Sequence, residues 1–268
     1  MVGPGVLTAL ALGGVVGVIL ALTGAGGGIL AVPLLIFGTG IGVAAAGPIG
    51  LMAVGMAAAL GAVLGLRAGV VRYRAALLIA ATGMLLSPAG LWAARQIDSR
   101  WLALLFALVL LYVALNTFRQ ASGKGATASA SHVVCKRDGD SGRFIWTRPC
   151  ALAMAVSGGL AGLLSGLLGV GGGFVMVPAL QRYTDLPMKS AVATSLAVIA
   201  LISLMGVAAT AASGRMDWAI ALPFSAGAVA GMLGGRKLAA RLAGPQLQKG
   251  FAAVSALVAV AMIVKAVS

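Results

Sequence analysis

The residues with the clearest potential for ligand chemistry are two glycine clusters set in apolar sequence. The first runs from Gly24 to Gly28 as Gly-Ala-Gly-Gly-Gly, and the second runs from Gly169 to Gly173 as Gly-Val-Gly-Gly-Gly. A glycine inside a helix costs about 1 kcal/mol relative to alanine, and a proline removes a backbone donor. Each cluster, with the proline that follows it, therefore predicts a broken helix. The predicted helix-breaking residues are Gly24, Pro33, Gly169 and Pro178.

Consecutive glycines at a helix break can bind an anion through backbone N–H groups that no side chain covers. A short helix that begins directly after them points the positive end of its dipole at the same place. Within a membrane, irregular backbone is tolerated only where it is buried in protein or lines a cavity. Two such breaks are therefore predicted to form an anion site. The predicted substrate-binding glycines are Gly26, Gly27, Gly28, Gly171, Gly172 and Gly173.

Two hydroxyl side chains, Thr194 and Ser195, open the apolar run that follows the second cluster. They are the predicted side-chain ligands of the same anion. The alternative is that both hydroxyls bond to carbonyl groups of their own helix, and the sequence leaves the two interpretations open. The corresponding residues of the first half, Ile49 and Gly50, carry no hydroxyl, so the predicted site is asymmetric.

Acidic residues are absent from the apolar runs, which excludes several kinds of chemistry. The chain has five Asp and no Glu, at positions 98, 138, 140, 185 and 217, all outside the apolar runs. Intramembrane acids are the usual carriers of proton coupling, so a carboxylate relay and a cation site are both disfavoured. The sequence shows no nucleophile–base pair and no phosphate-binding loop. We therefore expect neither an enzyme nor a bound metal or cofactor.

The two cysteines, Cys135 and Cys150, lie 15 residues apart in the one hydrophilic stretch of the chain. Their spacing is not typical of a metal site. His132 lies near Cys135, but two ligands do not make a zinc site. We therefore expect free, solvated thiols.

The composition identifies an all-α polytopic membrane protein. Of 268 residues, 61% are hydrophobic and 9% are charged, whereas a soluble domain carries about 25% charged residues. Several apolar runs reach the roughly 20 residues that cross a bilayer, and about 8–10 membrane segments are expected. Residues 1–5 include no basic side chain, so we expect no cleaved signal peptide.

The second half of the chain repeats the first at a fixed offset. The shift from Gly24 to Gly169 is 145 residues, and the same shift relates Gly13 to Gly158 and Gly90 to Gly235. This duplication predicts a first membrane repeat over 1–118, a linker over 119–149 and a second repeat over 150–268. Each repeat is expected to contain one glycine-broken hairpin and three transmembrane helices.

The basic residues predict the orientation of these repeats. The net charge of +14 comes from 19 Lys and Arg, which lie mostly in short gaps between apolar runs, so they indicate topology rather than a nucleic-acid partner. The charge bias changes sides between the halves, as inverted repeats require. With the linker cytoplasmic and both termini extracytoplasmic, 15 of the 19 lie on the cytoplasmic side. The four outside are Arg95, Arg100, Arg215 and Lys265.

At these residues the sequence resembles the TauE/SafE sulfite exporter family, also called the 4-toluene sulfonate uptake permease family. The resemblance rests on Gly24–Pro33, Gly169–Pro178, the Ala-Thr-Ser-Leu segment at 193–196 and the two-half layout. The segment Pro48–Leu51 of this chain departs from the Gly-Thr-Ser-type pattern often seen in the first half of family members. The resemblance implies a bacterial or organellar inner-membrane permease for sulfur-containing anions.

The leading hypothesis is a multi-pass permease of the bacterial inner membrane that exports or exchanges sulfite or organosulfonates. Paired interrupted helices in inverted repeats are typical of transporters whose substrate binds near the membrane midplane. Its partners would be the anion and the lipid bilayer, and the sequence does not fix an oligomeric state. The alternative is a non-transporting scaffold whose basic cytoplasmic face binds a protein or anionic lipid.

Overall fold

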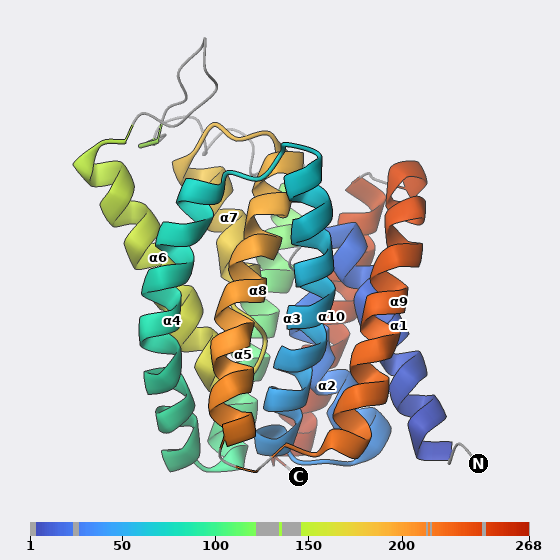
Figure 1. Cartoon of the computed structure of the whole chain (residues 1–268). Coiled ribbons are helices and arrows are strands. Elements are labelled where there is room, and N and C mark those ends of the chain that lie inside the picture. The colour runs from blue at the N-terminus through green and yellow to red at the C-terminus, as the bar shows by residue number, and fades with distance from the viewer. Residues whose placement is uncertain are drawn as a thin grey trace.

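The computed structural model is a bundle of helices (Figure 1). It describes residues 4–23, 27–121, 134–135, 146–212, 214, 216–242 and 245–267. Within these ranges there are ten helices: α1 (Pro4–Thr23), α2 (Gly27–Thr39), α3 (Val43–Arg67), α4 (Tyr73–Gln96), α5 (Ser99–Ala121), α6 (Arg148–Leu168), α7 (Gly173–Tyr183), α8 (Met188–Ala212), α9 (Trp218–Leu242) and α10 (Pro245–Val267).

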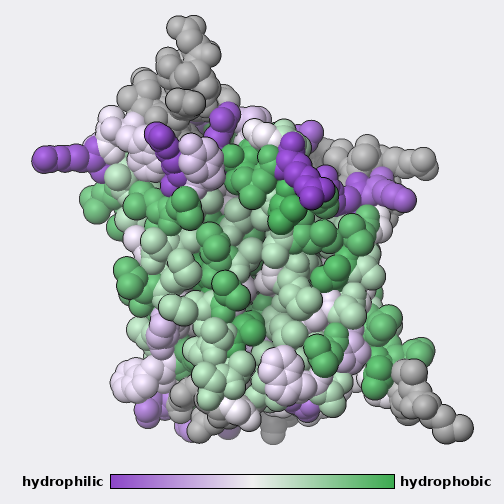
Figure 2. All heavy atoms as spheres, viewed as in Figure 1, coloured by the Kyte–Doolittle hydropathy of each residue, from purple (hydrophilic) through white to green (hydrophobic). Residues whose placement is uncertain are grey.

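The helices have the length and surface of a membrane protein. Seven of them, among the described residues, are long and apolar enough to cross a bilayer. The sides of the bundle are apolar, and the hydrophilic residues gather at its two ends (Figure 2). The predicted all-α polytopic membrane class is confirmed.

Both predicted broken helices are present as helical hairpins. Helix α1 ends at Thr23 and α2 begins at Gly27, while α6 ends at Leu168 and α7 begins at Gly173. Gly24 and Gly26 lie outside the described residues. The assignment of the two prolines as helix breakers is wrong. They lie inside α2 and α7, where helices in a packed bundle tolerate proline because neighbouring groups satisfy the freed carbonyl.

The two hairpins enter the bundle from opposite ends. Figure 1 places both chain termini at one end, and α6 begins at the other end. With 13 and 11 residues, α2 and α7 are roughly 20 and 16 Å long, so together they match the roughly 37 Å of the 25-residue α8. Both breaks therefore lie in the middle of the bundle.

The helix packing follows the duplication. Helix α1 packs on α9 and α6 packs on α4, and these two pairs correspond under the 145-residue shift. Helices α3 and α8 correspond to each other and pack together, as do α5 and α10. The orientation of the halves relative to a membrane remains a prediction.

Glycines bring the backbones of these helix pairs into direct contact. A Cβ added to Gly17 of α1 would lie 2.0 Å from the Ala228 carbonyl oxygen of α9. In the corresponding pair, a Cβ on Gly162 of α6 would lie 2.0 Å from the Gly83 carbonyl oxygen of α4. Small residues allow such approaches between membrane helices. These glycines therefore serve packing rather than ligand binding.

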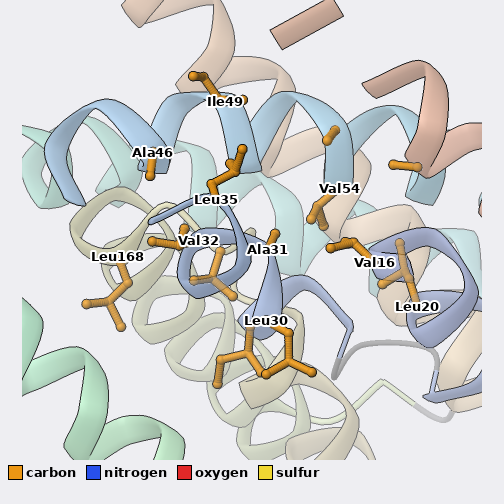
Figure 3. Packing of buried hydrophobic residues seen from close by; sticks show 14 of the residues in the cluster. Val16, Leu20, Leu30, Ala31, Val32, Leu35, Ala46, Ile49, Val54 and Leu168 are labelled. Atoms are coloured by element: carbon orange, nitrogen blue, oxygen red, sulfur yellow. The ribbon is translucent and has the colours of Figure 1, made fainter. Parts of the chain in front are cut away.

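Apolar side chains around the first hairpin fill the rest of the interior. Figure 3 shows Leu35 of α2 next to α3, which carries Ile49, and Leu30 on the opposite side of α2, with Leu168 of α6 near Val32. All of these side chains are buried, and they belong to one cluster that includes residues of both halves. The end of α6 is thus anchored in the same core as the first hairpin.

The expectation of free, solvated thiols is wrong, because Cys135 and Cys150 form a disulfide with an S–S distance of 1.97 Å. Both side chains are buried. The Cys135 N–H also donates to the Tyr183 carbonyl oxygen at 2.9 Å. The linker therefore ties the start of α6 to the end of α7. This pairing depends on where α7 ends in space, which cysteine spacing does not reveal.

The close backbone contacts predict which glycines tolerate alanine. Gly17→Ala and Gly162→Ala should each lower the melting temperature by about 2–10 °C, because forcing a methyl group into a packed contact costs about 1–3 kcal/mol. The matched control is Gly234→Ala on α9, where an added Cβ meets nothing within 4 Å. Thermal unfolding in detergent measures all three. Equal melting temperatures for Gly17→Ala and Gly234→Ala would contradict the packing described.

The disulfide predicts a stability that depends on redox conditions. It closes a loop of 15 residues, which in the chain-entropy description is worth about 3 kcal/mol. Reductant should therefore lower the melting temperature of the wild-type protein. Cys135→Ser should lower it to the same extent as the double change Cys135→Ser/Cys150→Ser, and reductant should not affect the double variant. Free thiols found by mass spectrometry in the oxidised protein would rule the bond out.

Candidate functional site

The second break is a tight turn that leaves the start of α7 uncapped. Gly169, Gly171 and Gly172 have φ angles of 70°, 79° and 67°, a left-handed conformation that strains every residue except glycine. The Gly169 N–H donates to the Ser165 carbonyl oxygen at 2.9 Å, which caps the end of α6. The N-cap residue of α7 is Gly172, which has no side chain to cap that helix, and the Val175 N–H donates to the Gly172 carbonyl oxygen at 3.2 Å.

The first break is built differently. The Gly27 N–H donates to Thr23 Oγ1 at 3.1 Å, and that hydroxyl donates in turn to the Ile19 carbonyl oxygen at 2.8 Å. A side chain therefore caps the start of α2. A Cβ on Gly27 would lie 2.3 Å from the Leu20 backbone nitrogen, so this glycine lets α2 fold back closely against α1.

The two breaks meet in the interior of the bundle. A Cβ on Gly28 would lie 2.8 Å from the Val170 carbonyl oxygen and 3.1 Å from Val54 Cγ1. A Cβ on Gly171 would lie 3.6 Å from the same Val54 atom, so Val54 of α3 stands between the two glycines. The predicted glycines that lie within the described residues are all buried: Gly27, Gly28, Gly171, Gly172 and Gly173.

Thr194 and Ser195, although fully buried, bond to other parts of the protein. Thr194 Oγ1 accepts a hydrogen bond from the Arg72 N–H at 3.1 Å and so holds the loop between α3 and α4. Ser195 Oγ donates to the Val192 carbonyl oxygen at 2.8 Å, which is the own-helix alternative considered from the sequence. These hydrogen bonds do not connect either hydroxyl to the glycine breaks.

A different hydroxyl, on Ser203 of α8, lies against the second break. A Cβ on Gly171 would be 3.2 Å from Ser203 Oγ and 3.0 Å from Ile199 Cγ2. Ser203 is 1% exposed, and its Oγ has no hydrogen-bond partner among the described residues. The hydroxyl of Ser165, in the last turn of α6, is also buried and has no hydrogen-bond partner in the part of the chain that the structure describes. In the sequence, Ser203 stands out only as a hydroxyl residue in the middle of an apolar run.

The electric field at the breaks comes from backbone groups. Every Lys or Arg whose side chain is described is exposed, except Arg72, which is partly buried beside the loop between α3 and α4. Within the same residues, no cluster of three or more His, Cys, Asp or Glu could hold a metal ion. A helix start carries about half a positive charge. The arrangement can therefore bind a small anion, but it offers no acid, base or nucleophile pair.

Comparisons with known proteins identify the family. The profile described as "Sulfite exporter TauE/SafE" matches residues 9–262. A "Probable membrane transporter protein" of Xylella fastidiosa (strain 9a5c) is 32% identical over 240 residues, covering 88% of this chain and 85% of the relative. The "Probable membrane transporter protein YunE" of Bacillus subtilis (strain 168) is 27% identical over 140 residues, covering 52% of this chain and 51% of the relative. No solved structure matches the chain. The chain thus belongs to the TauE/SafE sulfite exporter family and is a membrane transporter, not an enzyme.

Proposed function

We propose that this protein is a permease that exports or exchanges small sulfur-containing oxyanions, such as sulfite or organosulfonates, across the bacterial inner membrane. The observation that carries the proposal is the contact between two interrupted helices from different halves, seen where Gly28 meets the Val170 carbonyl. Interrupted helices are a recurrent way to build a substrate site near the midplane. Membership of a transporter family favours this function over a scaffold.

The anion is proposed to bind where the breaks meet, between Gly26–Gly28 and Gly171–Gly173. The glycines of the second break and the uncapped start of α7 supply N–H donors, and sulfur oxyanions present oxygen atoms that only accept. A bound oxyanion would therefore satisfy backbone donors that otherwise stay unpaired in an apolar interior. Thr194 and Ser195, the ligands predicted from the sequence, would have to leave their present hydrogen bonds to reach it.

Access to the two sides is proposed to alternate as two helix units, each built from one helix of either half, move against each other. The pairs α1–α9 and α4–α6 pack backbone to backbone through glycines, so each pair should move as a rigid unit. The α1–α2 hairpin enters from one end of the bundle and the α6–α7 hairpin from the other. A relative rotation of the units would open the break region to one end and close it to the other.

The proposed orientation has inverted repeats over 1–118 and 150–268, a cytoplasmic linker over 119–149 and extracytoplasmic termini. Its support is the excess of Lys and Arg at the linker end of the bundle (Figure 2). The disulfide at that end points the other way, because disulfides are rare in the cytosol. The charge bias outweighs the disulfide in this proposal, because it sums over many side chains and acts during insertion.

Transport assays in proteoliposomes test the proposal. Gly171→Ala should reduce sulfite and organosulfonate flux by about tenfold, because the added methyl group would crowd the bound anion. A loss of about 1.4 kcal/mol in binding free energy is enough for that effect. The added Cβ would lie 3.0 Å from Ile199 Cγ2, inside the proposed site.

Gly69→Ala is the matched control for backbone strain. Gly69 has a φ of +68° and an added Cβ there would meet nothing within 4 Å, so this variant should keep its flux within about twofold of wild type. Equal flux in the two variants would argue against the site. A wild-type protein that moves neither sulfite nor organosulfonates would refute the proposed function itself.

A further inference from the structure

We infer that the site selects a singly charged anion and holds it chiefly at the second break, through the N–H groups of the first two residues of α7 and the hydroxyl of Ser203. This inference rests on the proposed function and narrows it in two ways. It names the charge state of the substrate, and it names a side-chain ligand in α8 that differs from Thr194 and Ser195.

The first step is the inequality of the two helix starts. At α2, the Thr23 hydroxyl already accepts the Gly27 N–H, so a ligand would have to displace an existing hydrogen bond. At α7, the N-cap residue Gly172 has no side chain to cap the helix. The Val175 N–H donates to the Gly172 carbonyl oxygen, so the N–H groups of Gly173 and Phe174 are the ones proposed to bind the ligand. Donors that are free before binding contribute more net free energy than donors that must first be released. The second break is therefore the stronger half of the site.

The second step is the position of Ser203. Its Oγ lies where a Cβ of Gly171 would be only 3.2 Å away, and no described residue accepts its proton. A buried hydroxyl without a partner destabilises the fold through its lost hydration. An oxyanion oxygen placed at the start of α7 would accept a hydrogen bond from Ser203 and remove that penalty. The oxygen atoms of the bound anion would then accept hydrogen bonds from both the Ser203 hydroxyl and the backbone N–H groups.

The third step is the absence of a fixed positive charge near the break among the described side chains. The ionisable side chains that the structure describes on the helices around the break lie near helix ends; they are Arg67 of α3, Tyr73 and Arg74 of α4, Arg148 of α6, Arg182 and Tyr183 of α7 and Lys189 of α8. The cost of moving an ion out of water rises with the square of its charge, whereas the start of a helix supplies only about half a charge. A dianion is therefore strongly disfavoured compared with a monoanion.

Uptake by the full-length protein in proteoliposomes, measured with sulfite and with methanesulfonate, tests the charge selection. Sulfite becomes the singly charged bisulfite as the pH falls through neutrality, whereas methanesulfonate stays singly charged. The apparent KM for total sulfite should therefore fall at acidic pH, while the KM for methanesulfonate stays constant. A sulfite KM that is constant or falls at alkaline pH would overturn the inference. If the KM for methanesulfonate changed with pH in parallel, the pH dependence would come from the protein rather than from the charge of sulfite. That result would also overturn the inference.

Ser203→Ala tests the ligand. It should raise the KM for methanesulfonate, and for sulfite at acidic pH, by about tenfold, the size expected for one hydrogen bond to a charged group. The melting temperature should not fall, because the hydroxyl has no partner to lose. Ser255→Ala is the control, since Ser255 is also buried without a partner but lies on α10, which packs on α5.

The outcomes separate the two claims. An unchanged KM in Ser203→Ala, with a transporting wild type, would overturn this inference and leave the proposed function standing. A tenfold KM increase in Ser255→Ala as well would also overturn it, because the effect would then be general to buried serines. A wild-type protein that transports neither anion would remove the proposed function and this inference together.

Discussion

A helix that stops inside an apolar bundle leaves backbone N–H and C=O groups without partners, and the rest of this structure depends on how those groups are satisfied. The end of α6 is satisfied by the Gly169 N–H bonding to the Ser165 carbonyl. The start of α2 is satisfied by the Thr23 hydroxyl. Of the two helix starts, only that of α7 has no side-chain cap. In water a missing cap would matter little, because water would bond to the N–H groups. In an apolar interior the missing cap creates a strong preference for a hydrogen-bond acceptor.

The surrounding packing preserves that situation. Glycines on α1, α4, α6 and α9 let the backbones of the α1–α9 and α4–α6 pairs touch. At the linker end, the Cys135–Cys150 disulfide and the hydrogen bond from Cys135 to Tyr183 hold the start of α6 and the end of α7 together. The site thus combines rigid outer pairs with unsatisfied donors at the centre.

Much of the fold could be predicted from the sequence, because glycine spacing and hydropathy act locally. The interruptions between Thr23 and Gly27 and between Leu168 and Gly173 follow from the intrinsic cost of glycine in a helix. The ten helices of the described residues follow from apolar runs repeated at one offset. Pro33 and Pro178 were misjudged because a proline's effect depends on whether neighbouring helices satisfy the carbonyl it frees.

The candidate site was harder to predict, because its members are set by tertiary neighbours. The Thr194 hydroxyl accepts a hydrogen bond from the backbone N–H of Arg72, which lies 122 residues away in sequence. Ser203 reaches the second break only because α8 packs across it, and its counterpart in the first half is Ala58, so the duplication gave no hint. The disulfide was missed for the same reason, since α7 must fold back before Cys135 lies beside Cys150.

The most direct measurement is the location of a bound oxyanion in a crystal of the full-length protein. Selenite has the shape of sulfite, and its selenium atom gives an anomalous signal that identifies its position. We predict an anomalous peak within about 4 Å of the backbone nitrogen of Gly173 and of Ser203 Oγ, the distance set by one hydrogen bond from each donor to a selenite oxygen. A peak found only at the basic end of the bundle, beside Arg182 or Lys189, would contradict binding at the helix breaks.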